Sequence, residues 1–304
     1  MTIAAIAMAL VLSSAFGGWG VVVSRRLPPR HATWLLSVGG VVAALSGLAV
    51  LALLGSLMLG EQPAVAHGGH WSVDALRDHA PVGRPTASAA ALLTGVLCTW
   101  AATVAIRCAG AVLAAYRSCR GLPRGAGELI VIPGASIGAY AVPGRPGRIV
   151  AGQRLLSALS PGQRRALLAH ERAHLSHGHH WHLAAVTVAG ALNPLLRPLR
   201  PATRCATERW ADEVAGTAVG DRLLVARALA TAARCASAPS RGALAATGHF
   251  VPLRVAALLR PAPEPRPLLT RLSLALLAAA AAAAFLAAKQ TEHLYEFARH
   301  VERY

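Results

Sequence analysis

The chain has 304 residues, 55% of them hydrophobic, and a mean hydropathy of +0.47. Ordinary soluble domains are less apolar, so the composition favours a membrane protein. The net charge of +17 comes almost entirely from arginine, since Lys289 is the single lysine. A basic face beside anionic lipid headgroups explains this charge as well as nucleic acid does. We therefore expect the lipid bilayer as a partner and no specific nucleic acid.

Four apolar stretches are long enough to cross a bilayer, which takes about 20 residues as a helix. They cover residues 2–23, 32–59, 87–106 and 268–288. The first stretch has no basic segment before it, so we interpret it as a retained helix rather than a signal peptide. The five cysteines have no C-x-x-C spacing and are interpreted as incidental reduced thiols.

The arginines of the connecting segments predict the orientation. They follow the first stretch at Arg25, Arg26 and Arg30, and the third stretch at Arg107, Arg117, Arg120 and Arg124. Because cytoplasmic loops carry the excess of positive residues, both of these segments are expected in the cytoplasm. Both chain ends and residues 61–86 are then expected outside.

Three regions follow from this pattern: a membrane region at residues 1–106, a cytoplasmic domain at 107–266, and a last membrane helix with its tail at 267–304. The cytoplasmic domain begins with strand patterns at 128–132 and 137–142, separated and followed by Pro-Gly turns. The predicted fold is mainly α and multi-pass, with about four transmembrane helices and an α+β domain that contains a small sheet.

Helices dominate the rest of the cytoplasmic domain. Ser160, Pro161 and Gln163 are typical of a capped helix start, and this helix is predicted to run to about Gly178. The apolar residues 183–192 are too few to span a membrane. Further helices are predicted at 203–219 and from Asp221 onward.

The sequence His-Glu-Arg-Ala-His occupies residues 170–174. On a helix the positions i and i+4 share one face, so His170 and His174 can bind one zinc ion while Glu171 lies beside the open coordination position. Zinc lowers the pKa of bound water to about 7, and Glu171 can then act as the general base. The alternative is a solvated, histidine-rich helix face, which would also contain the four histidines at positions 177, 179, 180 and 182.

A third ligand is sought among the few later acidic residues of this domain. Glu208 and Asp212 are four apart and share a helix face, so one can bind zinc while the other accepts the second N–H of a ligand histidine. His180 is a competing third ligand, at the spacing that metzincins use. The glycine of that motif is replaced by His177, and no methionine follows for a Met-turn, so we reject this alternative.

At these residues the sequence resembles two groups of integral-membrane gluzincins, the HtpX-like and CAAX-prenyl-type proteases and the BlaR/MecR-like antibiotic-sensing peptidases. The matching segments are 137–142, 167–175 and 208–216, and His249 with Arg254 and Val255 resembles a later family segment. The resemblance implies a zincin-like domain with one Zn²⁺ per chain at His170, His174 and Glu208. It also implies Glu171 as base and Asp212 behind a ligand histidine. The antibiotic sensors carry an extracellular penicillin-binding domain after the last helix, whereas 16 residues follow it here, so direct β-lactam sensing is not expected.

Other polar residues are assigned mainly structural roles. Tyr140, His249 or Arg254 could stabilise an oxyanion, although single polar residues are more often structural. His67, His70 and His79 lack regular metal-ligand spacing. The tract from His177 to His182 is interpreted as a polar extension of the motif helix.

The sequence therefore predicts a membrane-bound zinc endopeptidase that cuts a cytoplasmic or membrane-associated protein or peptide. One alternative is a catalytically silent zinc-binding signalling or scaffold protein, against which the intact Glu171 argues. Another is a metal-handling membrane protein, which would need ionisable residues inside the membrane helices; the first three apolar stretches have almost none.

Overall fold

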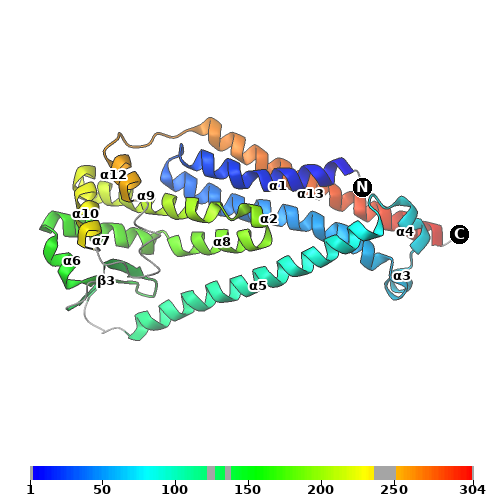
Figure 1. Cartoon of the computed structure of the whole chain (residues 1–304), viewed down its shortest axis with the longest axis horizontal. Helices are drawn as coiled ribbons and strands as arrows, with labels where there is room; N and C mark the ends of the chain where they lie inside the picture. Colours follow the sequence, from blue (N-terminus) through cyan, green and yellow to red (C-terminus); the bar gives the residue numbers. More distant parts are fainter. Residues whose placement is uncertain (1–2, 122–126, 134–137, 236–250, 303–304) are drawn as a thin grey trace.

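The computed structural model describes residues 3–121, 127–133, 138–235 and 251–302. Four of its helices are long and apolar enough to cross a membrane. These are α1 (Ile3–Ser24), α2 (Pro29–Gly60), α5 (Arg84–Gly121) and α13 (Pro267–Glu302). They run side by side along the length of the molecule, with α5 inclined to the others (Figure 1). The predicted multi-pass, mainly helical fold with a small sheet is confirmed.

Two of these helices are much longer than their apolar stretches. With 38 residues, α5 is about 57 Å long, roughly twice the thickness of a bilayer core. It continues past residue 106 because alanines, arginines and Leu113 favour helix there. The helix α13 likewise extends beyond residue 288, where Leu294 and Ala298 pack against Leu76. That contact joins it to α4 (Val73–His79), which follows the short α3 (Pro63–Gly69).

The sheet contains three short strands, β1 (Leu129–Ile132), β2 (Ala139–Val142) and β3 (Arg148–Gly152). Their order is β1-β3-β2, with β1 parallel and β2 antiparallel to the central β3. The strand β2 is therefore an edge of the described sheet. The predicted start of this strand at Ile137 lies outside the described residues.

The remaining helices connect the sheet to the membrane bundle. They are α6 (Gln153–Ala158), α7 (Pro161–Ser176), α8 (His179–Leu192), the short η1 (Pro194–Leu196), α9 (Leu199–Val219), α10 (Arg222–Cys235) and α12 (Val251–Leu258). The sheet, α6, α7, α10 and α12 lie at one end of the molecule, and α3, α4 and both termini lie at the other (Figure 1).

The prediction that residues 177–182 extend the motif helix is wrong. Helix α7 ends at Ser176, Gly178 adopts a left-handed conformation with φ of 60°, and α8 begins at His179. Glycine has no Cβ and adopts this conformation at little cost, so it redirects the chain. The histidines of this tract are consequently divided between the turn and a second helix.

The helices α8 and α9 pack directly against the membrane helices. One buried cluster combines Val186 and Ala189 of α8 and Leu199 of α9 with Phe16 of α1 and Leu36 of α2. Burial of these apolar side chains removes them from water or lipid and fixes the helices against one another. Helix α8 and the start of α9 therefore adjoin the bundle of membrane helices.

Candidate metal centre

A capping box fixes the start of the helix that carries the motif. The Gln163 backbone N–H donates to Ser160 Oγ, and the Ser160 backbone N–H donates to Gln163 Oε1. Pro161 occupies the first turn, where its missing N–H costs nothing. The predicted helix start is confirmed, and the helical register puts His170 and His174 on one face of α7.

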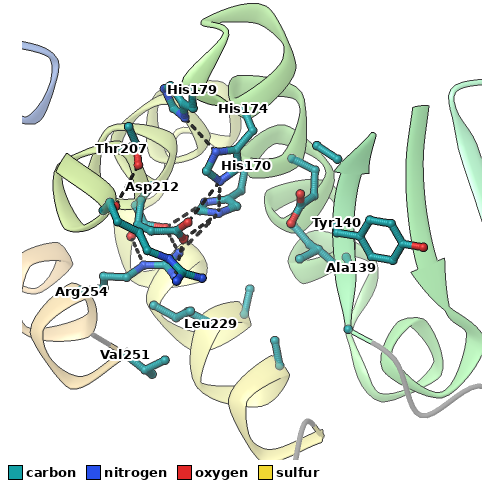
Figure 2. Close-up of a pocket in the computed structure, with 18 of the residues that line it drawn as sticks. Ala139, Tyr140, His170, His174, His179, Thr207, Asp212, Leu229, Val251 and Arg254 are labelled. Carbon is teal, nitrogen blue, oxygen red and sulfur yellow. Dashed lines mark hydrogen bonds and ion pairs between the residues drawn. The ribbon is translucent and has the colours of Figure 1, made fainter. Parts of the chain in front are cut away.

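Helix α9 brings a carboxylate to the two imidazoles. The Nε2 atoms of His170 and His174 are 3.1 Å apart. The Glu208 carboxylate oxygens lie 3.6 Å from Nε2 of His170 and 3.7 Å from Nε2 of His174. Among the described residues these three form the single group of metal-ligating side chains whose donor atoms all lie within 4.8 Å of one another. Figure 2 shows the two rings side by side in the pocket.

The second nitrogen of each imidazole is also held. Nδ1 of His170 is 3.0 Å from Oδ1 of Asp212, and Nδ1 of His174 is 2.8 Å from Nδ1 of His179. If both motif histidines donate Nδ1–H, each leaves an Nε2 lone pair directed into the pocket. His179 is then the acceptor, and its own Nε2 is buried without a hydrogen-bond partner among the described residues.

Arg254 of α12 lies against the same group of side chains, with its Nη2 3.5 Å from Nε2 of His170. Its Nε and Nη2 donate to the two Asp212 oxygens at 2.8 and 2.7 Å, and its Nη1 lies 2.8 Å from Oε2 of Glu208. Only 7% of Arg254 is exposed, so this bidentate ion pair is largely shielded from water. The guanidinium thus holds both acidic side chains of α9, and Figure 2 shows its contact with Asp212.

Glu171 lies beside the histidine pair and is 7% exposed. Burial raises the pKa of its carboxyl group, while the positive charge on His170 and a hydrogen bond from the backbone of Ala141 oppose the rise. The contact with Ala141 connects the carboxyl group to the edge strand β2. Glu171 is thus placed between the metal-ligating side chains and the sheet edge.

The buried charges of the site do not balance by themselves. Glu171, Glu208 and Asp212 provide three carboxylates, and Arg254 provides one guanidinium. Burial would lower the pKa of His170, but its hydrogen bonds with Asp212 and Glu208 raise that pKa to about 10. Burial lowers the pKa of His174 to about 4, so this imidazole is neutral. Once His170 loses this proton to bind a metal, a dication would complete the balance, because its two charges equal the excess of carboxylates over guanidinium.

The site opens into a cavity of about 1020 Å³. Its lining includes β2, with Ala139 and Ala141, and apolar residues of α10, with Leu229 and Ala232. An unpaired strand edge offers backbone N–H and C=O groups to an extended peptide. The cavity therefore has room for a peptide between the sheet edge and the α9 carboxylates.

The comparisons with known proteins bear on the same region. Residues 120–196 match the model of Peptidase family M48. This family contains the HtpX-like and BlaR/MecR-like membrane zinc metallopeptidases, so the resemblance indicated by the sequence is confirmed. No curated protein and no solved structure matches the chain.

The M48 match covers the sheet, α7 and α8, and it supports a metallopeptidase. Glu208, Asp212 and Arg254 lie beyond the matched residues. Their place in the site therefore depends on the geometry of α9 and α12. His180 is outside the three-residue metal-ligating group, which agrees with rejection of the metzincin spacing.

The sequence did not predict the contacts that His179 and Arg254 make in the site. His179 reaches His174 because of the turn at Gly178, and Arg254 reaches Asp212 across 42 positions. Tyr140 is 49% exposed, and its ring points away from the histidines (Figure 2). His249 lies outside the described residues.

Proposed function

We propose that this protein is a membrane-bound zinc endopeptidase that hydrolyses peptide bonds of a cytoplasmic or membrane-associated protein. The observation that carries the proposal is the convergence of His170, His174 and Glu208, with Glu171 beside them. The M48 match and the four candidate membrane helices support it independently.

The ligand set fits one zinc ion per chain, held by His170, His174 and Glu208. Two nitrogens that share a tetrahedral zinc lie about 3.3 Å apart, close to the 3.1 Å between the two Nε2 atoms. Two histidines and one carboxylate are a usual catalytic set, which leaves a coordination position for water or substrate. When bound, zinc supplies a Lewis acid that lowers the pKa of water to about 7 and polarises the scissile carbonyl.

Each surrounding side chain then has a defined task. The Glu171 carboxylate takes a proton from the attacking water and delivers it to the leaving amine. Asp212 keeps His170 in the tautomer that donates from Nδ1, and it is a positioning residue because it acts through that histidine. The edge of β2 aligns the substrate backbone next to Glu171.

We further propose that residues 107–266 form the catalytic region on the cytoplasmic side, between the membrane regions 1–106 and 267–304. The arginine-rich segments support this orientation. The termini lie at the opposite end of the bundle (Figure 1). Protease protection in sealed vesicles tests it, using epitope tags at the C-terminus and at Asp221, between α9 and α10. Protection of the Asp221 tag in inside-out vesicles would reverse the proposed sidedness.

The function is tested by purifying the full-length protein in detergent, measuring its metal content, and assaying cleavage of casein and peptides. We expect about one zinc per chain and cleavage that Glu171→Gln abolishes while zinc stays bound. The matched control Glu128→Gln alters a partly exposed carboxylate that pairs with Arg172, and it should leave cleavage intact. Zinc without cleavage in the wild type would favour the silent scaffold instead.

A further inference from the structure

Four residues of α9 follow one another at helical spacing along the cavity wall. Arg200, Arg204, Glu208 and Asp212 are each four positions apart, and all four line the cavity. Residues at this spacing share one helix face. The last two belong to the proposed metal centre, and the first two continue the same face toward the start of the helix. Two arginines are therefore aligned with the proposed zinc ligand.

The two arginines have no acidic partner in the part of the chain that the structure describes. The carboxylates lining the cavity are Glu171, Glu208 and Asp212, all of which belong to the metal centre. The ion pairs of the described residues include neither Arg200 nor Arg204. Arg200 Nε donates to Thr187 Oγ1 at 3.2 Å, which orients the guanidinium without neutralising it. This end of the cavity is consequently positive.

The positive end differs from the opposite end in both chemistry and location. Leu199, next to Arg200, packs in the buried cluster shared with the membrane helices, so this end adjoins the bundle. The other end is lined by apolar residues of α10, such as Leu229 and Ala233. A bound peptide would place unlike side chains at the two ends.

We propose that Arg200 and Arg204 form a subsite that binds an acidic side chain, Asp or Glu, of the substrate. This inference rests on the proposed peptidase function and specifies its substrate class. At 1.5 Å per residue, Arg204 and Arg200 lie about 6 and 12 Å along α9 from Glu208. An extended peptide advances about 3.3 Å per residue, so the acidic residue lies about two to four positions from the cleaved bond.

Anionic lipid headgroups are the competing ligand, because the positive end adjoins the membrane helices. A headgroup, however, requires no alignment with the metal centre. Both arginines share the face of α9 that bears Glu208 and line the cavity beside it. Arg197, three residues before Arg200, is exposed and does not line the cavity. It would serve a headgroup equally well and provides a matched control.

The test uses the full-length, zinc-loaded protein in a neutral detergent without anionic lipid. Peptides of one apolar sequence carry a single glutamate, moved position by position around the cleaved bond, and each is compared with its glutamine counterpart. The readouts are kcat/KM for the wild type and the dissociation constant for the Glu171→Gln variant. We expect about tenfold preference for glutamate at one position on one side of the bond.

The variants identify the arginines as the cause. Arg204→Gln and Arg200→Gln should each reduce the preference, and Arg204→Glu should reverse it toward a peptide with lysine at that position. Arg197→Gln should leave it unchanged. A merely structural role would not produce reversal by the complementary charge, so this result distinguishes recognition from a loss of folding.

The remaining outcomes separate the two proposals. Cleavage without any glutamate preference would overturn the subsite and leave the peptidase function standing. Glutamate-selective binding by zinc-loaded protein that cleaves no peptide would support the subsite and overturn the peptidase. If the arginine variants change activity only in vesicles containing anionic lipid, and equally for all peptides, the arginines bind headgroups and the subsite is refuted.

Discussion

The Nδ1 atom of His174 lies 2.8 Å from Nδ1 of His179, so the second motif histidine is held by the first turn of the following helix. The other motif histidine is held by a carboxylate, Asp212. The two proposed imidazole ligands thus have different supports, one neutral and one charged. This difference determines how the site should respond to mutation and pH.

Removing the neutral support should loosen the metal. The substitution His179→Leu takes away the acceptor for His174, and loss of such a support typically costs about 10- to 100-fold in metal affinity. His179→Asn keeps an acceptor and should lose less. Zinc affinity is measured by competition with a chelator in detergent.

The neighbouring His177 is the matched control for this prediction. It is exposed, stacks on Trp210 and has its ring centre 6.0 Å from that of His179, but among the described residues it contacts neither motif histidine. His177→Gln should leave zinc affinity unchanged. Equal losses in the two variants would mean that His179 supports the fold of the histidine turn rather than the ligand.

Arg254 should contribute strongly to stability when metal is absent. Arg254→Gln would remove the guanidinium that pairs with the buried Asp212 and Glu208, and breaking a buried pair costs about 3–5 kcal/mol. Added zinc should recover part of this loss, since the dication also neutralises the carboxylates. Thermal unfolding with and without a chelator measures both effects.

An exposed arginine provides the comparison. Arg172 pairs with Glu128 at 2.7 Å, but its side chain is 53% exposed, so Arg172→Gln should cost less than about 1 kcal/mol. A similar loss of stability in both variants would contradict the assignment of Arg254 as the buried counterion.

Zinc binding should release protons. Burial opposes protonation of His170, but Asp212 and Glu208 raise its pKa to about 10, so this imidazole is protonated in the metal-free protein at neutral pH. A ligand nitrogen must lose its proton, so zinc affinity should rise about tenfold per pH unit below pH 10 for each proton displaced. His174, whose pKa is lowered to about 4 chiefly by burial, is already neutral and should release none.

Calorimetric titration with zinc in buffers of different ionisation enthalpy measures the number of protons released. We expect at least one released proton per zinc near neutral pH. Burial also raises the pKa of Glu171, so a proton lost from that carboxyl group on zinc binding would add to the number released. A binding enthalpy independent of the buffer, together with an affinity that does not change with pH, would contradict the charge arrangement described here.

Local sequence patterns predicted those parts of the site that depend on one helix. The spacing of His170 and His174 and the cap at Ser160 are properties of α7 alone, and both could be read from adjacent residues. Glu208 was a candidate third ligand because few carboxylates follow the motif in this domain and because it lies four residues before Asp212. These inferences required no knowledge of how helices pack.

The other features depend on tertiary structure. Arg254 contacts Asp212 only because α12 packs beside α9, and no periodicity links residues 42 apart. Gly178 was not recognised as a turn, so the histidine tract was wrongly joined to the motif helix and the contact of His179 was missed. The length of α5 was underestimated because hydropathy marks the apolar stretch, whereas helix propensity continues beyond it.

The central claim is that His170, His174 and Glu208 share one metal. X-ray absorption spectroscopy of the zinc-loaded, full-length protein tests it most directly, with Glu208→Ala for comparison and Glu213→Ala as a control on the same helix. Glu213 pairs with Arg222 rather than with the histidines. We predict two imidazole nitrogens with oxygen ligands around zinc, and loss of the metal in Glu208→Ala alone. A third imidazole, a sulfur ligand, or zinc retained unchanged in Glu208→Ala would contradict the account.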